Sequence, residues 1–431
     1  MLHSPNVTLD KYSVSLRTGF LPSVPPLQKL ENAYYWPWED IVWDLPSHIQ
    51  CRTIRQAVEE LPILSTSKLH EEPEWRRAYL LLAYLMHAYI WGGERPKDVL
   101  PPSISCPFLE VSNHLELPPC ATYAALNLWN FAVSDHTADM TDPENLYVTA
   151  SFTGTKDEEW FLMVSVAIEA KGAQLIPLML EAFHAASVDD AQRVCDLLNQ
   201  LNKGLQELRQ LFERMYENCR PAVFFHQLRP ILAGSKNMAS AGLPNGVFYD
   251  EGHGKGKWHQ YSGGSNAQSS LIQTFDIFLG VEHSATGEMK SNGATKPPAK
   301  TAFMLEMRNY MPGPHRRFLE MMSRASNIRA YAMSHKADSP VRDAYNAAVM
   351  SLGLFRDSHI KMVTRYIIMA AKMKPTNTMP SQVNLATSTT TRMEGLNEKV
   401  SGGLHGTGGT DLIPFLKKTR DTTKAAALYT D

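Results

Sequence analysis

The chain has 431 residues, of which 44% are hydrophobic and 20% charged, so it can bury a conventional core and form more than one domain. Its 42 lysines and arginines nearly balance its 44 aspartates and glutamates, and the formal net charge of −2 gives no bulk attraction to nucleic acid or to an anionic membrane. The five cysteines are widely spaced, without a C-x-x-C pair, which argues against a disulfide framework and fits a reducing compartment.

The sequence does not start with a basic segment followed by an apolar one, as a signal peptide does. Its longest apolar run, YLLLAYLMHAYIW at 79–91, is too short to span a bilayer. We therefore expect a soluble, cytoplasmic, monomeric protein that binds neither nucleic acid nor a membrane.

The first part of the chain alternates short helical patterns with proline-rich segments. Helices are predicted at 47–61 and 74–90, and six prolines in 95–119 indicate a linker or a long buried crossover. We place a small, mixed but mainly helical N-terminal domain and this linker at 1–119, and a large all-helical domain at 120–431.

The second part is dominated by long helical patterns. Residues 158–184 are almost continuously apolar, which is typical of a central helix, and Pro177 should kink or divide it near Gln174. Residues 234–266 are glycine-rich and read as a loop that leads into a buried helix at 267–281. No repeat or convincing set of strands is visible, so the predicted fold class is all-α.

A single histidine, His359, interrupts an apolar helical stripe in LGLFRDSHIKMVTRYIIMAA, residues 352–371. The apolar neighbours recur every three or four residues, which places the imidazole on a face that points into the core. Its partner there can be a backbone carbonyl, a metal ion or a haem iron. The helix alone favours the carbonyl, and Arg356, one turn earlier, can pair with a carboxylate.

Two aromatic clusters contain a polar residue. Phe161 and Ser165 are four residues apart and share a helix face, and Arg229 follows Phe224 and Phe225. In isolation, ordinary packing explains both clusters.

Two glycine segments precede helical patterns, GGSNAQSS at 263–270 and GTGGT at 406–410. Glycines there allow the backbone to approach a ligand closely, but a tight turn or a linker accounts for them equally well. The sequence has no G-x-x-x-x-G-K-[ST], H-E-x-x-H or G-x-S-x-G motif.

Long co-linear motifs in this chain resemble the indoleamine 2,3-dioxygenase family. They are LELPP before Tyr123, WFLMVSVAIEA, GGSNAQSSLIQTFDIFLGVEH, MRNYMPGPHRRFL, SHIKMVTRYII and GTGGTDLIPFLKKTR. The resemblance runs from about residue 20 to the C-terminal helix. It implies that the large helical domain encloses haem b, active with ferrous iron, and that His359 is the proximal iron ligand. It further implies that Arg356 and Asp276 form the polar network behind this histidine.

The same resemblance implies the composition of the substrate pocket. Ser165 and Arg229 are implied as catalytic residues, with Arg229 holding the substrate carboxylate. The implied substrate-binding residues are Tyr123, Phe161, Phe224, Phe225, Arg229, Gly264, Ser265 and Thr407. The implied reaction inserts both atoms of O2 across the indole C2–C3 bond of L-tryptophan or a related indoleamine, giving N-formylkynurenine, and an electron donor must reduce the haem.

The sequence departs from the family pattern at Asn127 and Asn266, where apolar or small residues are common, and this can change substrate preference. Two alternatives remain. A haem or gas sensor would keep His359 without turnover, and a helical interaction protein would bind no haem. Retention of Arg229, Phe224 and GTGGT favours the enzyme, because a sensor has no use for a carboxylate clamp.

Overall fold

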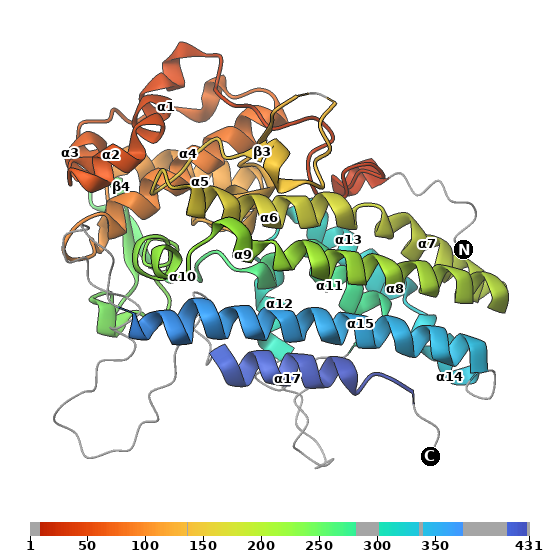
Figure 1. Cartoon of the computed structure of the whole chain (residues 1–431). Coiled ribbons are helices and arrows are strands. Elements are labelled where there is room, and N and C mark those ends of the chain that lie inside the picture. The colour runs from red at the N-terminus through yellow and green to blue at the C-terminus, as the bar shows by residue number, and fades with distance from the viewer. Residues whose placement is uncertain (1–8, 136, 282–300, 336–338, 374–411, 429–431) are drawn as a thin grey trace, which may run out of the picture.

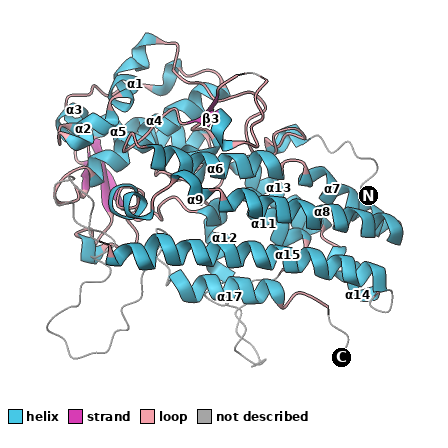
Figure 2. Ribbon diagram, viewed as in Figure 1, coloured by secondary structure: helices cyan, strands magenta, loops and turns pink. Residues whose placement is uncertain are grey.

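The computed structural model describes residues 9–135, 137–281, 301–335, 339–373 and 412–428. Helices dominate it, and the strands are short (Figure 2). The all-α prediction is confirmed.

The helices of the first part are α1 (Trp36–Trp43), α2 (Leu45–Gln50), α3 (Ile54–Glu59), α4 (Glu72–Trp91) and α5 (Pro102–His114). Those that follow are α6 (Lys156–Gly172), α7 (Leu175–Ser187), α8 (Ala191–Glu213), α9 (Met215–Asn218), α10 (Pro221–Val223), α11 (Ser270–Phe278), α12 (Thr301–Arg308), α13 (Gly313–Ala325), α14 (Ile328–Ser334), α15 (Ser339–Val363) and α17 (Leu412–Lys424).

The long helices of the second part run side by side in layers. α15 packs between α8 and α17, and α8 also packs on α6 and α7 (Figure 1). Local signals start several of these helices: the side chains of Thr155, Asp190 and Ser269 accept hydrogen bonds from the first free backbone N–H groups of α6, α8 and α11. The predicted division before Pro177 is confirmed, because α6 ends at Gly172 and α7 begins at Leu175.

The segment Lys156–Ser187 is long and apolar enough to cross a membrane by length and composition. In the structure 72% of its 18-residue apolar window is buried inside the protein, which is the environment of a core helix.

Two stretches differ from the sequence-based prediction. The proline-rich stretch 95–119 contains α5, whose first prolines occupy the helix start, where a missing N–H costs nothing. The loop predicted at 234–266 contains a hairpin of β4 (Val247–Gly252) and β5 (Lys255–His259). Parallel pairing of β4 with β1 (Val99–Leu100) completes a small sheet. A second pair joins β2 (Ala132–Val133) to β3 (Leu146–Tyr147).

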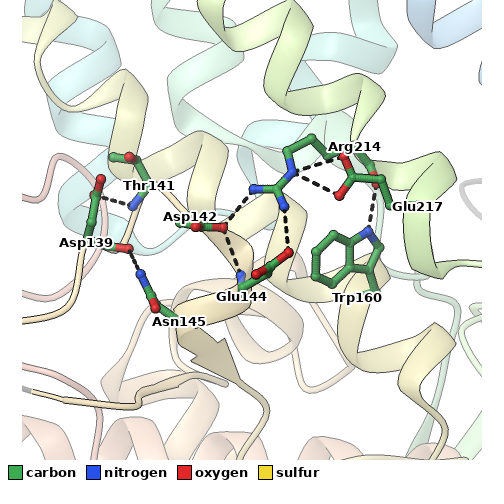
Figure 3. Close-up of polar contacts among 8 residues, drawn as sticks. All are labelled: Asp139, Thr141, Asp142, Glu144, Asn145, Trp160, Arg214 and Glu217. Carbon is green, nitrogen blue, oxygen red and sulfur yellow. Dashed lines mark hydrogen bonds and ion pairs between the residues drawn. The ribbon is translucent and has the colours of Figure 1, made fainter.

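The start of α6 is tied to the end of α8 by Arg214 (Figure 3). Its guanidinium binds Asp142 and Glu144 in the preceding loop at 2.7 and 3.2 Å, and Glu217 on the other side at 3.0 Å. Its backbone carbonyl accepts a hydrogen bond from the Trp160 indole at 2.8 Å. These contacts fix the register of α6, which carries Phe161 and Ser165.

The hydrophobic residues form two large cores. One is built around α1–α5 and the 117–152 region, and the other around α6–α8, α11 and α13–α15. The rings of Phe161 and Phe224 pack against both cores, so the site that these rings line lies where the two cores meet. The predicted division at residue 119 stays a prediction.

Candidate active site

Two neighbouring cavities, of about 180 and 110 Å³, meet at His359 on α15. Both are lined mainly by apolar and aromatic side chains. The larger cavity contains Tyr123, Phe161, Phe224, Arg229, Gly264, Ser265 and His359. The smaller one contains Tyr123, Ser165, Arg356 and His359. The structure therefore brings together most residues that the sequence proposed, although they come from distant parts of the chain.

The His359 imidazole makes no hydrogen bond to any residue in the described part of the chain. Burial, helped by the positive charge of Arg356, lowers its pKa to about 4, so the ring is neutral near pH 7. His87 in α4 shows what a structural histidine looks like in the same protein: its Nδ1 contacts the Ile231 carbonyl oxygen at 2.8 Å, and its Nε2 accepts from the Ala121 N–H at 3.1 Å. His359, in contrast, presents an imidazole that is free to bind a ligand inside a cavity.

The predicted pair behind His359 is confirmed as a contact. Arg356 Nη2 binds both carboxylate oxygens of Asp276 in α11 at 2.7 Å, and Arg356 Nη1 donates to Thr423 in α17. Both charged side chains are buried, at 9 and 6% exposure. The histidine helix is thereby fastened to α11 and α17.

Arg229 places a buried positive charge in the larger cavity. The side chain is 6% exposed, and burial lowers its pKa to about 10, so the guanidinium is protonated near neutral pH. Phe225 lies beneath it, with its ring centroid 5.7 Å from the guanidinium carbon.

Phe225 itself lines neither cavity, which corrects its assignment to substrate contact. Neighbouring residues of a helix point in different directions, and here only Phe224 of the two phenylalanines lines the larger cavity. Phe224 faces the cavity, whereas Phe225 is fully buried and supports Arg229.

Two other polar residues, Ser165 and Thr407, were predicted to contact the ligands of the site. Ser165 lines the smaller cavity, where its hydroxyl contacts the Phe161 carbonyl oxygen at 3.4 Å, so its catalytic role stays a prediction. Thr407 lies outside the described residues.

The G-G-S segment packs closely against its surroundings. A Cβ on Gly263 would lie 2.3 Å from the Leu232 carbonyl oxygen, and one on Gly264 would lie 2.3 Å from the Leu126 side chain. Close backbone approach therefore requires glycine at 263, whereas a side chain at 264 would displace Leu126, and Gly264 lines the larger cavity.

Tyr123 is held by a buried polar network that the sequence analysis missed. Its hydroxyl donates to Glu169 Oε1 at 3.1 Å, and Ser269 donates to the same oxygen at 2.7 Å. The Tyr123 N–H donates to Gln268 Oε1 at 2.9 Å. The sequence contained one indication of this network, because Glu169 is a charged residue within the apolar helical segment WFLMVSVAIEA.

Three π-helical turns supply parts of the larger cavity. They span Ala124–Leu128, Phe224–Leu228 and Thr364–Met369. The extra residue in a π-helical turn rotates the side chains relative to an α-helix, and such turns occur frequently at functional sites. Leu126, Phe224 and Tyr366 from these turns face the cavity.

The sequence matches the indoleamine 2,3-dioxygenase family over residues 8–426. The chain belongs to this family. It is 42% identical to an indoleamine 2,3-dioxygenase of Penicillium citrinum, across 99% of this chain and 90% of that protein. It is 40% identical to the indoleamine 2,3-dioxygenase of Saccharomyces cerevisiae, across 98 and 94% of the two chains. A 6-hydroxytryptophan 2,3-dioxygenase of Fusarium equiseti is 36% identical, across 96% of each chain.

An indoleamine 2,3-dioxygenase is an oxidoreductase that acts on indoles with O2, and this family depends on haem. The residues present fit that cofactor. His359 would offer a neutral imidazole to an iron, and the two largely apolar cavities that it lines suit a flat apolar macrocycle. Arg356 and Asp276 stand behind the histidine and fix its helix.

Part of the cavity wall comes from residues that no sequence motif indicated. Phe212 of α8 and Phe415 and Leu416 of α17 line both cavities. Their apolar helical spacing predicts burial but does not indicate that the buried face meets a cavity.

Proposed function

We propose that this enzyme converts L-tryptophan and O2 into N-formylkynurenine. In this reaction the indole C2–C3 bond is cleaved and each of the two carbons receives one oxygen atom, so the overall conversion consumes no external reductant. The observation that supports the proposal best is one cavity that contains both the buried guanidinium of Arg229 and the His359 imidazole, which has no hydrogen bond to the residues that the structure describes.

Each wall of the cavity has a physical role in this proposal. Arg229 binds the substrate carboxylate through its planar fork, in surroundings where water competes little. Phe161 and Phe224, whose ring centroids lie 4.8 Å apart, enclose the flat indole together with Tyr123 and exclude water. Haem, held by His359, supplies O2 binding and oxygen transfer when its iron is ferrous.

The proposal includes an electron donor that keeps the iron reduced, a monomeric protein and a cytoplasmic location. The exact indole is also part of the proposal, since a relative in this family is named for 6-hydroxytryptophan. A haem-binding homologue with little or no turnover is the alternative, and the experiment below separates the two.

The test uses protein loaded with haem, reduced, and mixed with L-tryptophan under ¹⁸O2. The expected product is N-formylkynurenine that carries two ¹⁸O atoms, measured by mass spectrometry. A Soret band without this product would leave only the non-catalytic homologue. A product with a single ¹⁸O atom would contradict dioxygen insertion.

A further inference from the structure

Asn127 places an amide in the wall of the larger cavity. It lies in the π-helical turn Ala124–Leu128, one turn after Tyr123, and its side chain is 4% exposed. The same wall includes the apolar side chains of Leu126, Phe161 and Leu162. A buried amide among apolar groups is unfavourable unless its hydrogen-bonding atoms find partners.

The hydrogen bonds of Asn127 are incomplete. Its Nδ2 donates over a long 3.4 Å to the Tyr123 carbonyl oxygen. Its Oδ1 is buried and accepts no hydrogen bond from any group that the structure describes. This orientation of the amide is the favourable one, because exchanging the two atoms would turn Oδ1 toward another carbonyl oxygen.

Asn130, three residues later, shows how a structural asparagine is satisfied in the same region. Its Nδ2 donates to the Tyr84 hydroxyl at 2.7 Å and to the Ala150 carbonyl at 3.0 Å. Its Oδ1 accepts from the backbone N–H groups of Thr149 and Ala150 at 3.0 and 2.8 Å. Within the described part of the chain, Asn127 has no comparable partner for its oxygen, and the oxygen lies in the cavity wall, where a bound ligand can donate to it.

The chemistry of that ligand follows from the other groups in the cavity. The carboxylate of an amino-acid substrate matches Arg229, and the apolar wall around Asn127 matches the aromatic ring. A hydroxyl on that ring donates one hydrogen bond and accepts others, so it can meet Oδ1 within the apolar wall.

We propose that Asn127 is a specificity residue, whose Oδ1 accepts a hydrogen bond from a hydroxyl group on the indole ring. Ring-hydroxylated tryptophans are then preferred over tryptophans with a substituent of similar size that cannot donate. This inference rests on the proposed function, since it concerns the substrate of the same cavity.

The test compares hydroxytryptophans with fluorotryptophans substituted at the same ring carbon, using haem-loaded wild type and Asn127→Leu. Leucine keeps the approximate shape of asparagine and removes the acceptor. For at least one ring position, the wild type is expected to favour hydroxyl over fluorine by about tenfold in kcat/KM, the value of one good hydrogen bond. In Asn127→Leu this preference should fall to about twofold or less.

Two controls make the comparison specific. Asn127→Ala repeats the measurement in case leucine prevents folding. Asn199→Leu, the same replacement at an exposed position of α8, should leave the hydroxyl-to-fluorine ratio unchanged. Calorimetric Kd values for the same substrate pairs without O2 should change in parallel with kcat/KM, which separates recognition from turnover.

The possible outcomes separate the role of Asn127 from the proposed dioxygenase activity. An unchanged hydroxyl-to-fluorine ratio in Asn127→Leu, or an equal loss for every substrate including tryptophan, would overturn the role of Asn127 while leaving the dioxygenase intact. Equal loss would identify a donor common to all these substrates, such as the indole N–H. Failure of the wild type to convert tryptophan or any hydroxytryptophan would overturn the proposed function itself.

Discussion

The substitution Glu169→Gln tests the protonation of a buried carboxyl group that accepts a hydrogen bond from Tyr123 in the cavity wall. Glu169 is 1% exposed, and its Oε1 accepts hydrogen bonds from Tyr123 and Ser269. Its Oε2 makes no hydrogen bond within the described ranges of the chain. Burial raises the pKa of this group from 4.5 to about 7, and the two hydrogen bonds offset only part of that effect.

This pKa predicts how stability depends on pH. The folded protein holds the proton of Glu169 more tightly than the unfolded chain does, so this group favours folding less as pH rises from about 4.5 through about 7. Above that range Glu169 lowers the free energy of unfolding by about 3 kcal/mol, because each unit of pKa shift corresponds to about 1.36 kcal/mol. Glutamine is neutral at every pH and has nearly the same shape. Glu169→Gln should therefore match the wild type near pH 4 and be more stable by about 3 kcal/mol near pH 8.

The assay is urea unfolding of both proteins across this pH range, loaded with haem in the same way. Glu207→Gln is the control, because the hydrogen bond from Lys171 lowers the pKa of Glu207. Glu207 supports folding above its unfolded pKa, so its replacement should destabilise the protein slightly at high pH, by less than about 1 kcal/mol for this partly exposed pair. A Glu169→Gln difference that is independent of pH, or that grows toward low pH, would refute the assigned protonation.

Three further predictions concern the site. His359→Ala should leave the helical circular-dichroism signal intact and lose haem on gel filtration, and a variant that retains a normal Soret band would exclude this histidine as the ligand. Arg229→Leu should keep haem and raise the KM for tryptophan by about 100-fold, the cost of losing a buried charge pair, with tryptamine as the control that has no carboxylate. Asp276→Asn should lower the free energy of unfolding by about 3 kcal/mol, because the buried Arg356 loses its counter-charge. An unchanged urea midpoint would contradict that assignment.

Local sequence patterns predicted the helices because the causes of helix formation are themselves local. Apolar spacing identified the buried faces, and Pro177 marked the division of the central helix between Gly172 and Leu175. The same reasoning could not separate a core histidine from a ligand. Periodicity shows that His359 faces inward, but it is identical whether that face meets packed side chains or a cavity. Family motifs, which reflect the whole site, supplied the distinction.

The missed features depend on partners that are distant in the sequence. The β4–β5 hairpin lies in a glycine-rich segment, and β4 pairs with β1, which lies before the large helical region. Tyr123 and Glu169 are joined by a hydrogen bond that no local pattern signals. The direction of Phe225 depends on a π-helical turn, whose extra residue displaces the side chains from the positions of a regular α-helix.

Tyr123 also connects the site to the N-terminal part of the chain. The Tyr79 hydroxyl in α4 donates to the carbonyl oxygens of Pro118 and Cys120, at 2.8 and 2.9 Å, and His87 accepts from the Ala121 N–H. The backbone just before Tyr123 is thus held by α4, while Glu169 and Gln268 hold the tyrosine from the other side. Because both halves of the chain hold this aromatic wall, substitutions at Tyr79 or His87 of α4 should alter the larger cavity although neither residue lines it.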